Sequence, residues 1–426
     1  MVQFLIALLV LGILIFFHEL GHFLMARRMG VRVTHFSIGM PPKIVGKQVG
    51  ETEFLFSAIP FGGYVRLDGQ NPEDENPDDP KNYAAKKPWQ KSAILAAGSL
   101  MNLLLAFVIM PLVFILGVDM PAWRMDAPVV AKVEVGSAAE KAGFLPGDRI
   151  VRIQNETTQT WNEVFDHLAV REQGNIDFNV LRGDAVQTLT VLPHMLPQGQ
   201  SFGWKPLVQP VVGEMEPGSA ARQAGLQLGD KVLSVNGRAI TRWEELAEAV
   251  VKEGQNPLKL QIERKGSLVD VMLTPKKVGD RYMIGVRPPS KKQTYGFGEA
   301  VVKGTLDLMT MTGKTFEFLG RLVTGRASFN EVSGPVGIFS TIGEAAQSGF
   351  ANLLFLAALI TLQLGILNLL PIPPLDGGHL LILLIERVKG STLAVSTRMR
   401  IQMAGSVLLF GLLFVVTVRE IAQKFF

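Results

Sequence analysis

The chain has 426 residues, of which 48% are hydrophobic and 19% are charged, and its formal net charge at pH 7 is +4. The Lys and Arg residues form no long basic run, so nothing in the composition points to a nucleic-acid partner. Cysteine is absent, which excludes disulfides and thiolate metal sites. The apolar residues gather in blocks, which indicates membrane segments separated by soluble domains.

Four apolar segments are long enough to cross a bilayer, since about 20 helical residues span its hydrocarbon core. They lie at residues 1–26, 92–118, 346–386 and 401–420. A secretory signal peptide is the alternative for the first, but its start carries no Lys or Arg and no small-residue cleavage site follows. The fourth is the shortest and would cross with little tilt. We therefore expect a multi-pass α-helical membrane protein with four transmembrane helices.

Basic residues mark one side of the membrane. They lie in the loop 27–91 and between the third and fourth spans: Arg27, Arg28, Arg32, Lys81, Lys86, Lys87, Lys91, Arg387, Lys389, Arg398 and Arg400. The positive-inside rule places both loops in the cytoplasm. Both termini and the long segment between the second and third spans then lie outside.

The outer segment repeats itself at an offset of 82 residues. Gly136-Ser137-Ala138-Ala139 recurs as Gly218-Ser219-Ala220-Ala221, and Gly147-Asp148, Trp161 and Arg182 recur as Gly229-Asp230, Trp243 and Arg264. Such ungapped agreement indicates a duplicated unit. Each copy is predicted to contain a strand, a small-residue helix, a Gly-Asp turn, a second strand, a helix such as 161–170, and a hairpin.

This pattern resembles the circularly permuted PDZ domains of bacterial proteases. The resemblance implies one domain at residues 127–200 and a second at residues 206–288. PDZ domains add an extended peptide to a sheet edge and often hold its carboxylate in backbone N–H groups. The alternative is that the two domains are spacers without a ligand.

The sharpest chemical signal is His18-Glu19-Leu20-Gly21-His22, inside the first span. Residues i and i+4 share one face of a helix, so His18 and His22 can bind one cation between them. Glu19 lies next to that face and is placed to act as a general base. Two buried histidines that pair with each other are the alternative, but ionisable groups inside a membrane are costly and usually functional.

A catalytic zinc usually has three protein ligands and one open position. The other charged island in apolar sequence is Asn368-Leu369-Leu370-Pro371-Ile372-Pro373-Pro374-Leu375-Asp376-Gly377-Gly378-His379. Its prolines and glycines break the helix within a span, which is tolerated where the backbone lines a protein cavity. Asp376 is a suitable oxygen ligand, and His379 is the rival, one helical turn further on.

These two motifs together resemble the site-2 protease family of intramembrane metalloproteases, and the PDZ pair between the second and third spans adds to the likeness. The resemblance implies zinc bound by His18, His22 and Asp376, with Glu19 as catalytic base. It also implies that Asn368 holds the substrate backbone. One departure is visible, because the family's Ala-Gly-Pro motif reads Ala97-Gly98-Ser99 here, although Asn102 after it is retained.

A helical substrate must be unwound before cleavage, because its carbonyls are already bonded within the helix. Residues 27–91 contain β-like runs around Phe61-Gly62-Gly63, and the family has a membrane-reentrant β-element here. A glycine pair lets another backbone approach closely, so we expect an edge near Gly62, Gly63 and Tyr64 to pair with the substrate. An ordinary cytoplasmic hairpin is the alternative.

Residues 295–345 are expected to form an amphipathic, interfacial region. Within it, residues 296–325 combine apolar positions with lysines and glycines, which suits an interfacial amphipathic helix. The motif 333–338, Ser-Gly-Pro-Val-Gly-Ile, matches a family motif whose role the residues do not reveal. The acidic run 73–79 is interpreted as a solvated loop.

The expected protein is thus an intramembrane protease of a bacterial inner membrane, with both termini and the PDZ domains in the periplasm and the active site toward the cytoplasmic side. The resemblance implies single-span substrates of the anti-sigma-factor kind, cut after a first protease in a stress response, and remnant signal peptides. We expect the PDZ pair to act as a steric gate against large outer domains, with capture of new carboxyl termini as the alternative.

Three other functions are less consistent with the residues. A tethered, soluble-type zinc protease predicts hydrophilic flanks around the histidine motif, and this chain has apolar ones. A membrane scaffold that binds peptides through its PDZ pair leaves Glu19 and Asp376 without a purpose. A metal transporter rarely needs a glutamate between its two histidines.

Overall fold

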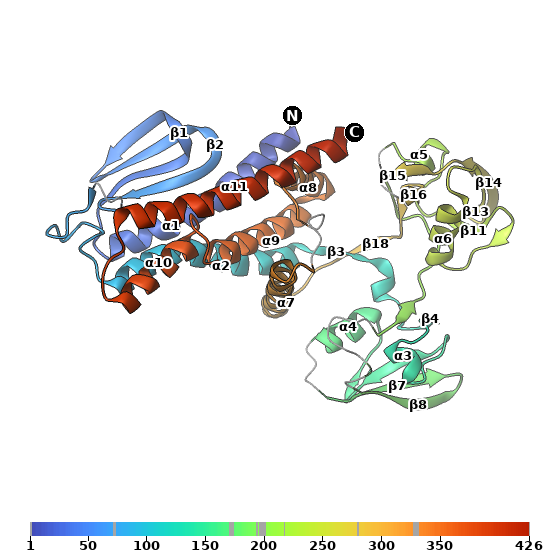
Figure 1. Ribbon diagram of the computed structural model, residues 1–426. Coiled ribbons are helices and arrows are strands. Elements are labelled where there is room, and N and C mark those ends of the chain that lie inside the picture. The colour runs from blue at the N-terminus through green and yellow to red at the C-terminus, as the bar shows by residue number, and fades with distance from the viewer. Residues whose placement is uncertain are drawn as a thin grey trace. The chain divides into compact units, whose positions relative to one another are not determined.

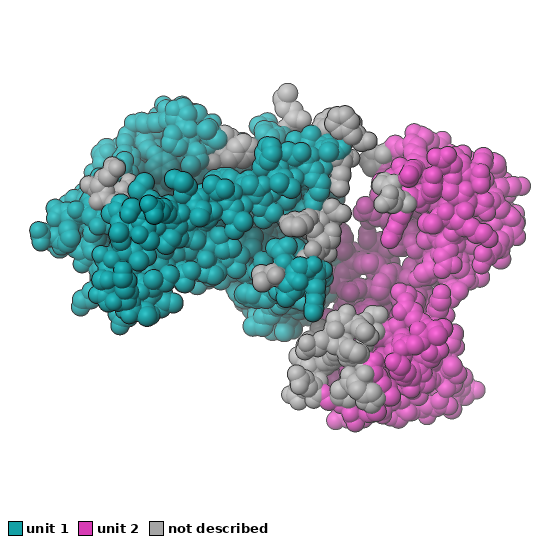
Figure 2. Space-filling model, viewed as in Figure 1, with its two compact units in different colours: residues 1–118, 294–426 teal, residues 119–293 magenta. Residues whose placement is uncertain are grey.

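The structure is a computed structural model that describes residues 2–70, 74–169, 174–192, 195, 202–216, 218–278, 281–326 and 332–425. It divides into two compact units, Met1–Val118 with Thr294–Phe426, and Asp119–Gln293 (Figure 2). The predicted domain range 127–200, the helix 161–170, the acidic run 73–79 and the region 295–345 each include residues outside the described part.

Unit 1 contains the membrane-spanning candidates. Four helices in its described residues are long and apolar enough to cross a membrane, as predicted: α1 (Val2–Arg28), α2 (Pro88–Leu116), α9 (Phe350–Asn368) and residues 395–422 of α11 (Val395–Phe425). The fourth is longer than the predicted 401–420, because the helix continues through charged residues at both ends.

Helix α2 is the centre of the bundle, and it packs against α1 on one side and α9 on the other (Figure 1). Glycines make both contacts close. A Cβ on Gly21 of α1 would collide with the Ala97 carbonyl of α2, and one on Gly365 of α9 would lie 3.0 Å from the Ser99 carbonyl oxygen. Small residues at such positions let helix backbones approach within a membrane.

The predicted third span, 346–386, is not one helix. Residues 346–348 end α8 (Pro335–Ser348), α9 stops at Asn368, and α10 (Asp376–Lys389) begins after a break at 369–375. The chain turns back tightly there, because Cβ atoms on Gly377 and Gly378 would collide with the backbone of the break itself. The break thus delivers Asp376 to the first turn of α10.

The loop after α1 forms a sheet from two long strands, β1 (Val33–Val49) and β2 (Thr52–Leu67). Both strands bend back on themselves. Residues 43–49 pair with 52–57, and Phe36 to Ile38 pair both with Phe54 to Phe56 and with Gly63 to Val65. The segment 63–67 therefore lies at one edge of the sheet and 43–49 at the other. The sheet packs on α1 through an aromatic cluster that includes Phe23, Phe36 and Phe54.

The region before α9 holds two helices, and the first of them lies where an amphipathic helix was predicted. Helix α7 (Phe297–Val323) packs on α2, where Gly304 meets Pro111. Helix α8 contacts α1, with the Phe4 and Phe339 rings stacked at 5.2 Å. The N-terminal end of α1 and the C-terminal end of α11 both lie beside α8 (Figure 1).

Unit 2 holds the two repeats, each built on a four-stranded sheet with the orders β6-β5-β7-β8 and β12-β11-β13-β14. The first repeat contains β4 (Val130–Val133), α3 (Ala138–Lys141), β5 (Arg149–Ile153), β6 (Glu156–Thr157), α4 (Trp161–Ala169), β7 (Ile176–Arg182), β8 (Ala185–Val191) and β9 (Trp204–Pro206). The second contains β10 (Glu214–Met215), α5 (Ala220–Gln223), β11 (Lys231–Val235), β12 (Arg238–Ala239), α6 (Trp243–Glu253), β13 (Leu258–Arg264), β14 (Ser267–Leu273), β15 (Lys276–Val278), β16 (Arg281–Met283) and β17 (Val286–Arg287). A 3-10 turn, Ala122–Met125, precedes them.

The repeated Arg and Asp residues form the same ion pair in both copies. In the first repeat, Arg182 donates through Nε and Nη2 to the carboxylate of Asp148 at 2.7 Å each, and Nη2 also bonds the Gly143 carbonyl at 2.8 Å. Arg264, Asp230 and Gly225 make the same contacts in the second repeat. A bidentate pair of this kind is among the stronger charged hydrogen bonds, and it ties the Gly-Asp turn to the hairpin in both copies.

The two ends of unit 2 are joined as a ribbon. Strand β3 (Val118–Pro121) pairs with β18 (Ser290–Gln293), and the Ala122 amide donates to the Pro289 carbonyl at 2.7 Å. The chain thus enters and leaves the repeats at neighbouring points.

Candidate metal centre and active site

Helix α1 presents the two histidines of its motif on one face. His18 and His22 lie one turn apart, and their ring centroids are 4.8 Å from each other. The side chains are largely buried, with 12% and 13% of their surface exposed. The ring of His22 lies where a Cβ on Gly98 of α2 would otherwise be, so the glycine makes room for the imidazole.

Asp376, at the start of α10, completes a group of three potential ligands. Its Oδ2 atom lies 3.4 Å from Nε2 of His18 and 3.4 Å from Nε2 of His22, and the two Nε2 atoms are 3.2 Å apart. This is the one such group of three His, Cys, Asp or Glu side chains in the described part of the chain.

These distances fit a tetrahedral zinc ion. Ligand atoms held tetrahedrally at about 2.0–2.2 Å from zinc are separated from each other by about 3.3–3.6 Å. Two imidazole nitrogens and a carboxylate oxygen are donors that zinc prefers. His22 fits in detail, because its Nδ1 lies 2.8 Å from the Ile94 carbonyl oxygen. That bond needs the proton on Nδ1, which leaves Nε2 with a free lone pair.

Helix α2 contacts every member of the group. Besides the Ile94 carbonyl beneath His22, Ser99 Oγ lies 3.1 Å from Asp376 Oδ2, and Asn102 Nδ2 lies 3.3 Å from His18 Nδ1. Ser99 and Asn102 are fully buried. Sequence reasoning missed Ser99, although its departure from the family motif was a signal that this position differs here.

Asn368, the last residue of α9, also reaches the centre. Its Nδ2 atom lies 3.5 Å from Nε2 of His18. The helix ends at this residue because the following segment holds three prolines, which cannot continue the helix. Asn368 therefore stands where an amide donor can face a group bound at the centre.

Glu19 lies between the histidine pair and the sheet edge. Its carboxylate is beside the backbone of Val65, and a Cβ on Gly63 would come within 3.2 Å of its Cγ. Gly63 thus leaves space for Glu19, while Gly62 adopts a φ of +99° that only glycine takes readily. Tyr64 follows on the same edge and pairs with Ser37.

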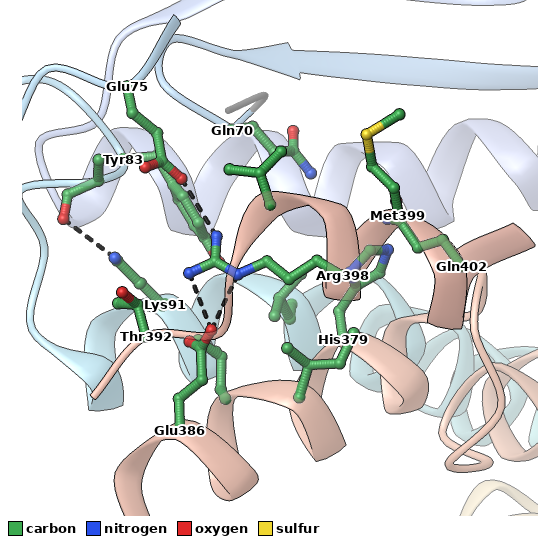
Figure 3. Close-up of a pocket in the computed structure, with 15 residues that line it drawn as sticks. Gln70, Glu75, Tyr83, Lys91, His379, Glu386, Thr392, Arg398, Met399 and Gln402 are labelled. Carbon is green, nitrogen blue, oxygen red and sulfur yellow. Dashed lines mark hydrogen bonds and ion pairs between the residues drawn. The ribbon is translucent and has the colours of Figure 1, made fainter. Parts of the chain in front are cut away.

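His379 points elsewhere. It lines a cavity of about 500 Å³ between α10, α11, the start of α2 and the loop before it (Figure 3). In that cavity Arg398 pairs with Glu386 at 2.8 Å and with Glu75 at 3.2 Å. Of the two rival third ligands, the structure brings Asp376 to the histidines and not His379.

Comparison of the sequence with known proteins shows the family to which the chain belongs. A family model described as peptidase family M50 matches residues 6–412. The regulator of sigma-E protease RseP of Salmonella typhimurium (strain 14028s / SGSC 2262) is 35% identical over 430 residues, covering 94% of both chains. The protein of the same name from Escherichia coli (strain K12) is 34% identical over 437 residues, again with 94% of both covered.

A more distant relative is similar over even more of its length. The zinc metalloprotease RasP of Geobacillus kaustophilus (strain HTA426) is 32% identical over 437 residues, covering 98% of this chain and 97% of the relative. The matched range includes the helices that carry His18, His22 and Asp376. The chain therefore belongs to peptidase family M50, the site-2 protease family, and is a zinc metalloprotease of the membrane.

Proposed function

We propose that this protease hydrolyses a peptide bond within or near the transmembrane segment of single-span membrane proteins, with zinc held by His18, His22 and Asp376 and with Glu19 as the general base. The observation that carries the proposal is the set of donor distances, 3.2 to 3.4 Å, with Glu19 one residue from His18. All of these residues lie on or beside apolar helices.

Zinc, when bound, supplies Lewis acidity toward water and toward the scissile carbonyl. Glu19 removes a proton from the attacking water and delivers it to the leaving amine. Asn368 donates from Nδ2 to the substrate, either to its backbone or to the oxyanion that develops during attack. Burial of the group limits the access of bulk water and strengthens these interactions.

The sheet edge 63–67 is the proposed binding site for the unwound substrate. In the described structure this segment pairs with β1 on one side only, and Val65 lies beside Glu19. An extended peptide added to this edge would pass next to the general base. Gly62, Gly63 and Tyr64 are then the residues that the substrate strand meets first.

The sheet is also proposed to enter the membrane. Its opposite edge exposes apolar side chains, with Ile44, Val45 and Val49 more than half exposed. Exposed apolar residues along a sheet edge are typical of a surface that contacts a membrane or another protein. This supports the reentrant β-element. From the positive-inside rule we further propose an active site near the cytoplasmic face, with both termini and unit 2 in the periplasm of a bacterial inner membrane.

The relatives named as regulators of sigma-E suggest the substrate class. We propose single-span proteins of the anti-sigma-factor kind, cut after another protease has removed their outer domain. The two repeats of unit 2 are proposed to be PDZ domains that exclude substrates with large outer domains. Their shared fold, with four-stranded sheets and one longer helix each, supports the assignment.

The test separates the base from the ligands. Glu19→Gln in the full-length protein in detergent should keep near-stoichiometric zinc and lose cleavage of a single-span reporter by roughly a thousandfold. His18→Ala should lose the zinc. Glu344→Gln, an exposed change on α8, serves as the matched control. Loss of zinc in Glu19→Gln, or cleavage near the normal rate, would refute the assignment.

A further inference from the structure

Helix α2 carries no residue of the proposed metal group, yet each member of the group has a polar contact to it. His22 bonds the Ile94 carbonyl, Asp376 accepts from Ser99, and His18 lies against Asn102. The three α2 positions are five and three residues apart and lie on the half of the helix that faces the group. One helix thus contacts all three potential ligands.

We infer that Asn102 and Ser99 are positioning residues of the metal centre, Asn102 by fixing the tautomer of His18 and Ser99 by fixing the carboxylate of Asp376. The inference rests on the proposed zinc centre. Neither residue is a proposed ligand. Asn102 contacts the Nδ1 atom of His18, and Ser99 contacts the carboxylate of Asp376.

The argument for Asn102 starts from the proton of His18. A neutral imidazole carries one proton, so binding a cation through Nε2 requires that proton on Nδ1, where it needs an acceptor. The Asn102 amide contacts Nδ1, with Nδ2 at 3.3 Å, and the Gly98 backbone also bonds the His18 ring. An N–H facing Nδ1 selects the other tautomer, in which Nε2 carries the proton and cannot bind a cation.

A second observation on the same residue resolves the conflict. Asn102 Oδ1 is buried and has no hydrogen-bond partner within the described part of the chain. A half-turn of the amide exchanges its oxygen and nitrogen, which have nearly the same size. Oδ1 then accepts from the Nδ1–H of His18, and Nε2 is free for the cation. In that orientation the amide favours the tautomer in which His18 can bind a metal through Nε2.

Ser99 acts on the third ligand. It is fully buried, and its hydroxyl donates to Asp376 Oδ2 at 3.1 Å, the same oxygen that lies between the two histidines. The contact joins residues far apart in the sequence and restricts the carboxylate to one orientation. A proline or alanine at this position has no donor, so this chain has a hydrogen bond that the usual Ala-Gly-Pro motif cannot make.

The test measures metal affinity, not cleavage, in the Glu19→Gln background. The full-length protein is stripped with a chelator and titrated with zinc, and the visible spectrum of the cobalt-substituted protein reports the ligand geometry. Removal of such partners of a ligand typically weakens metal binding 10- to 100-fold. We expect that loss for Asn102→Leu and Ser99→Ala, together with altered cobalt spectra.

Conservative variants distinguish positioning from packing. Asn102→Asp keeps the acceptor and Ser99→Thr keeps the donor, so both should bind zinc within a few-fold of the parent. Ser92→Ala, on the same helix but without these contacts, is the matched control. If Asn102→Leu does not fold, the Ser99 pair still tests the inference. Unchanged affinity and spectra in Asn102→Leu and Ser99→Ala, while His18→Ala loses zinc, would overturn this inference alone. Retention of zinc by His18→Ala would instead refute the proposed centre.

Discussion

Asp376 and His379 lie one turn apart at the start of α10, and their surroundings differ completely. Asp376 Oδ2 is 3.4 Å from both histidines of α1. His379 faces the cavity that contains Arg398 and Glu386 (Figure 3). A zinc ligand must contact the ion directly. Only the side chain of Asp376 points toward the two histidines, so Asp376 and not His379 is the candidate ligand.

Zinc content should therefore differ between two single variants. Asp376→Asn removes the anionic oxygen donor and should abolish cleavage and weaken zinc binding by at least tenfold. His379→Ala should keep measurable zinc. Both are measured by metal analysis of the purified protein after dialysis, with folding checked by thermal unfolding. Equal loss of zinc in the two well-folded variants would contradict the ligand set.

At the scale of elements, the Ser-Gly-Pro-Val-Gly-Ile motif gains a role that its residues did not reveal. It begins α8, and the carboxylate of Glu420 on α11 accepts from the backbone amides of Gly334 at 2.6 Å and Gly337 at 3.2 Å. A Cβ on Gly337 would come within 2.5 Å of the same carboxylate. The motif thus binds the C-terminal end of α11 through these hydrogen bonds, and α8 also packs against α1.

Loss of this contact should loosen α8. Glu420→Ala removes an anionic acceptor from a helix N-terminus, an effect worth about 1–2 kcal/mol, and should lower the melting temperature in detergent by roughly 2–4 °C. Glu344→Ala, on the exposed face of the same helix, should change it little. A melting temperature equal to that of the control would show that the contact of Glu420 with the start of α8 contributes nothing to stability.

The sheet edge offers a direct test of substrate pairing, because the chain contains no cysteine. With Tyr64→Cys in the Glu19→Gln background, a substrate with one cysteine near its cleavage site should form a disulfide with the protease under mild oxidation. Val49→Cys, on the opposite edge and more than half exposed, is the control. Cross-linking at Val49→Cys alone, or equally at both, would exclude the proposed edge.

At the scale of the whole molecule, the repeats fold as a unit with cores of their own. Two separate clusters of buried side chains, one around Trp161 and Phe178 and one around Leu246 and Leu260, stabilise them. Their entry and exit strands, β3 and β18, are already paired. The ribbon is therefore a suitable place at which to remove the repeats and close the chain with a short linker.

Deletion of residues 127–288 should permit cleavage of substrates that keep a large outer domain, if the repeats act as a steric gate. One reporter span is fused to outer domains of increasing size and offered to the intact and the deleted protease. The intact enzyme should cut only the smallest, and point changes at the PDZ grooves should matter little. The same size limit for both enzymes would exclude a gate and favour tail capture.

Much of the fold was predictable because its signals are local. The four apolar helices follow from runs of uncharged residues, and the duplicated unit follows from matched residues such as Asp148 and Asp230. The bends of β1 and β2, the helix α8 and the extension of α11 were not predictable. Each depends on contacts between distant segments, such as Glu420 with Gly334, and local patterns do not encode these pairings.

By itself the sequence determined which reactive side chains are present: two imidazoles one turn apart, a glutamate beside them, and an aspartate in a broken helix. The tertiary structure decided which groups meet. It directs Asp376 and not His379 to the histidines, because glycines 377 and 378 let α10 start against the backbone of the break. It also places Ser99 on Asp376 across 277 residues of sequence. Hydropathy and spacing describe a chain one segment at a time, whereas such contacts arise only when the helices pack.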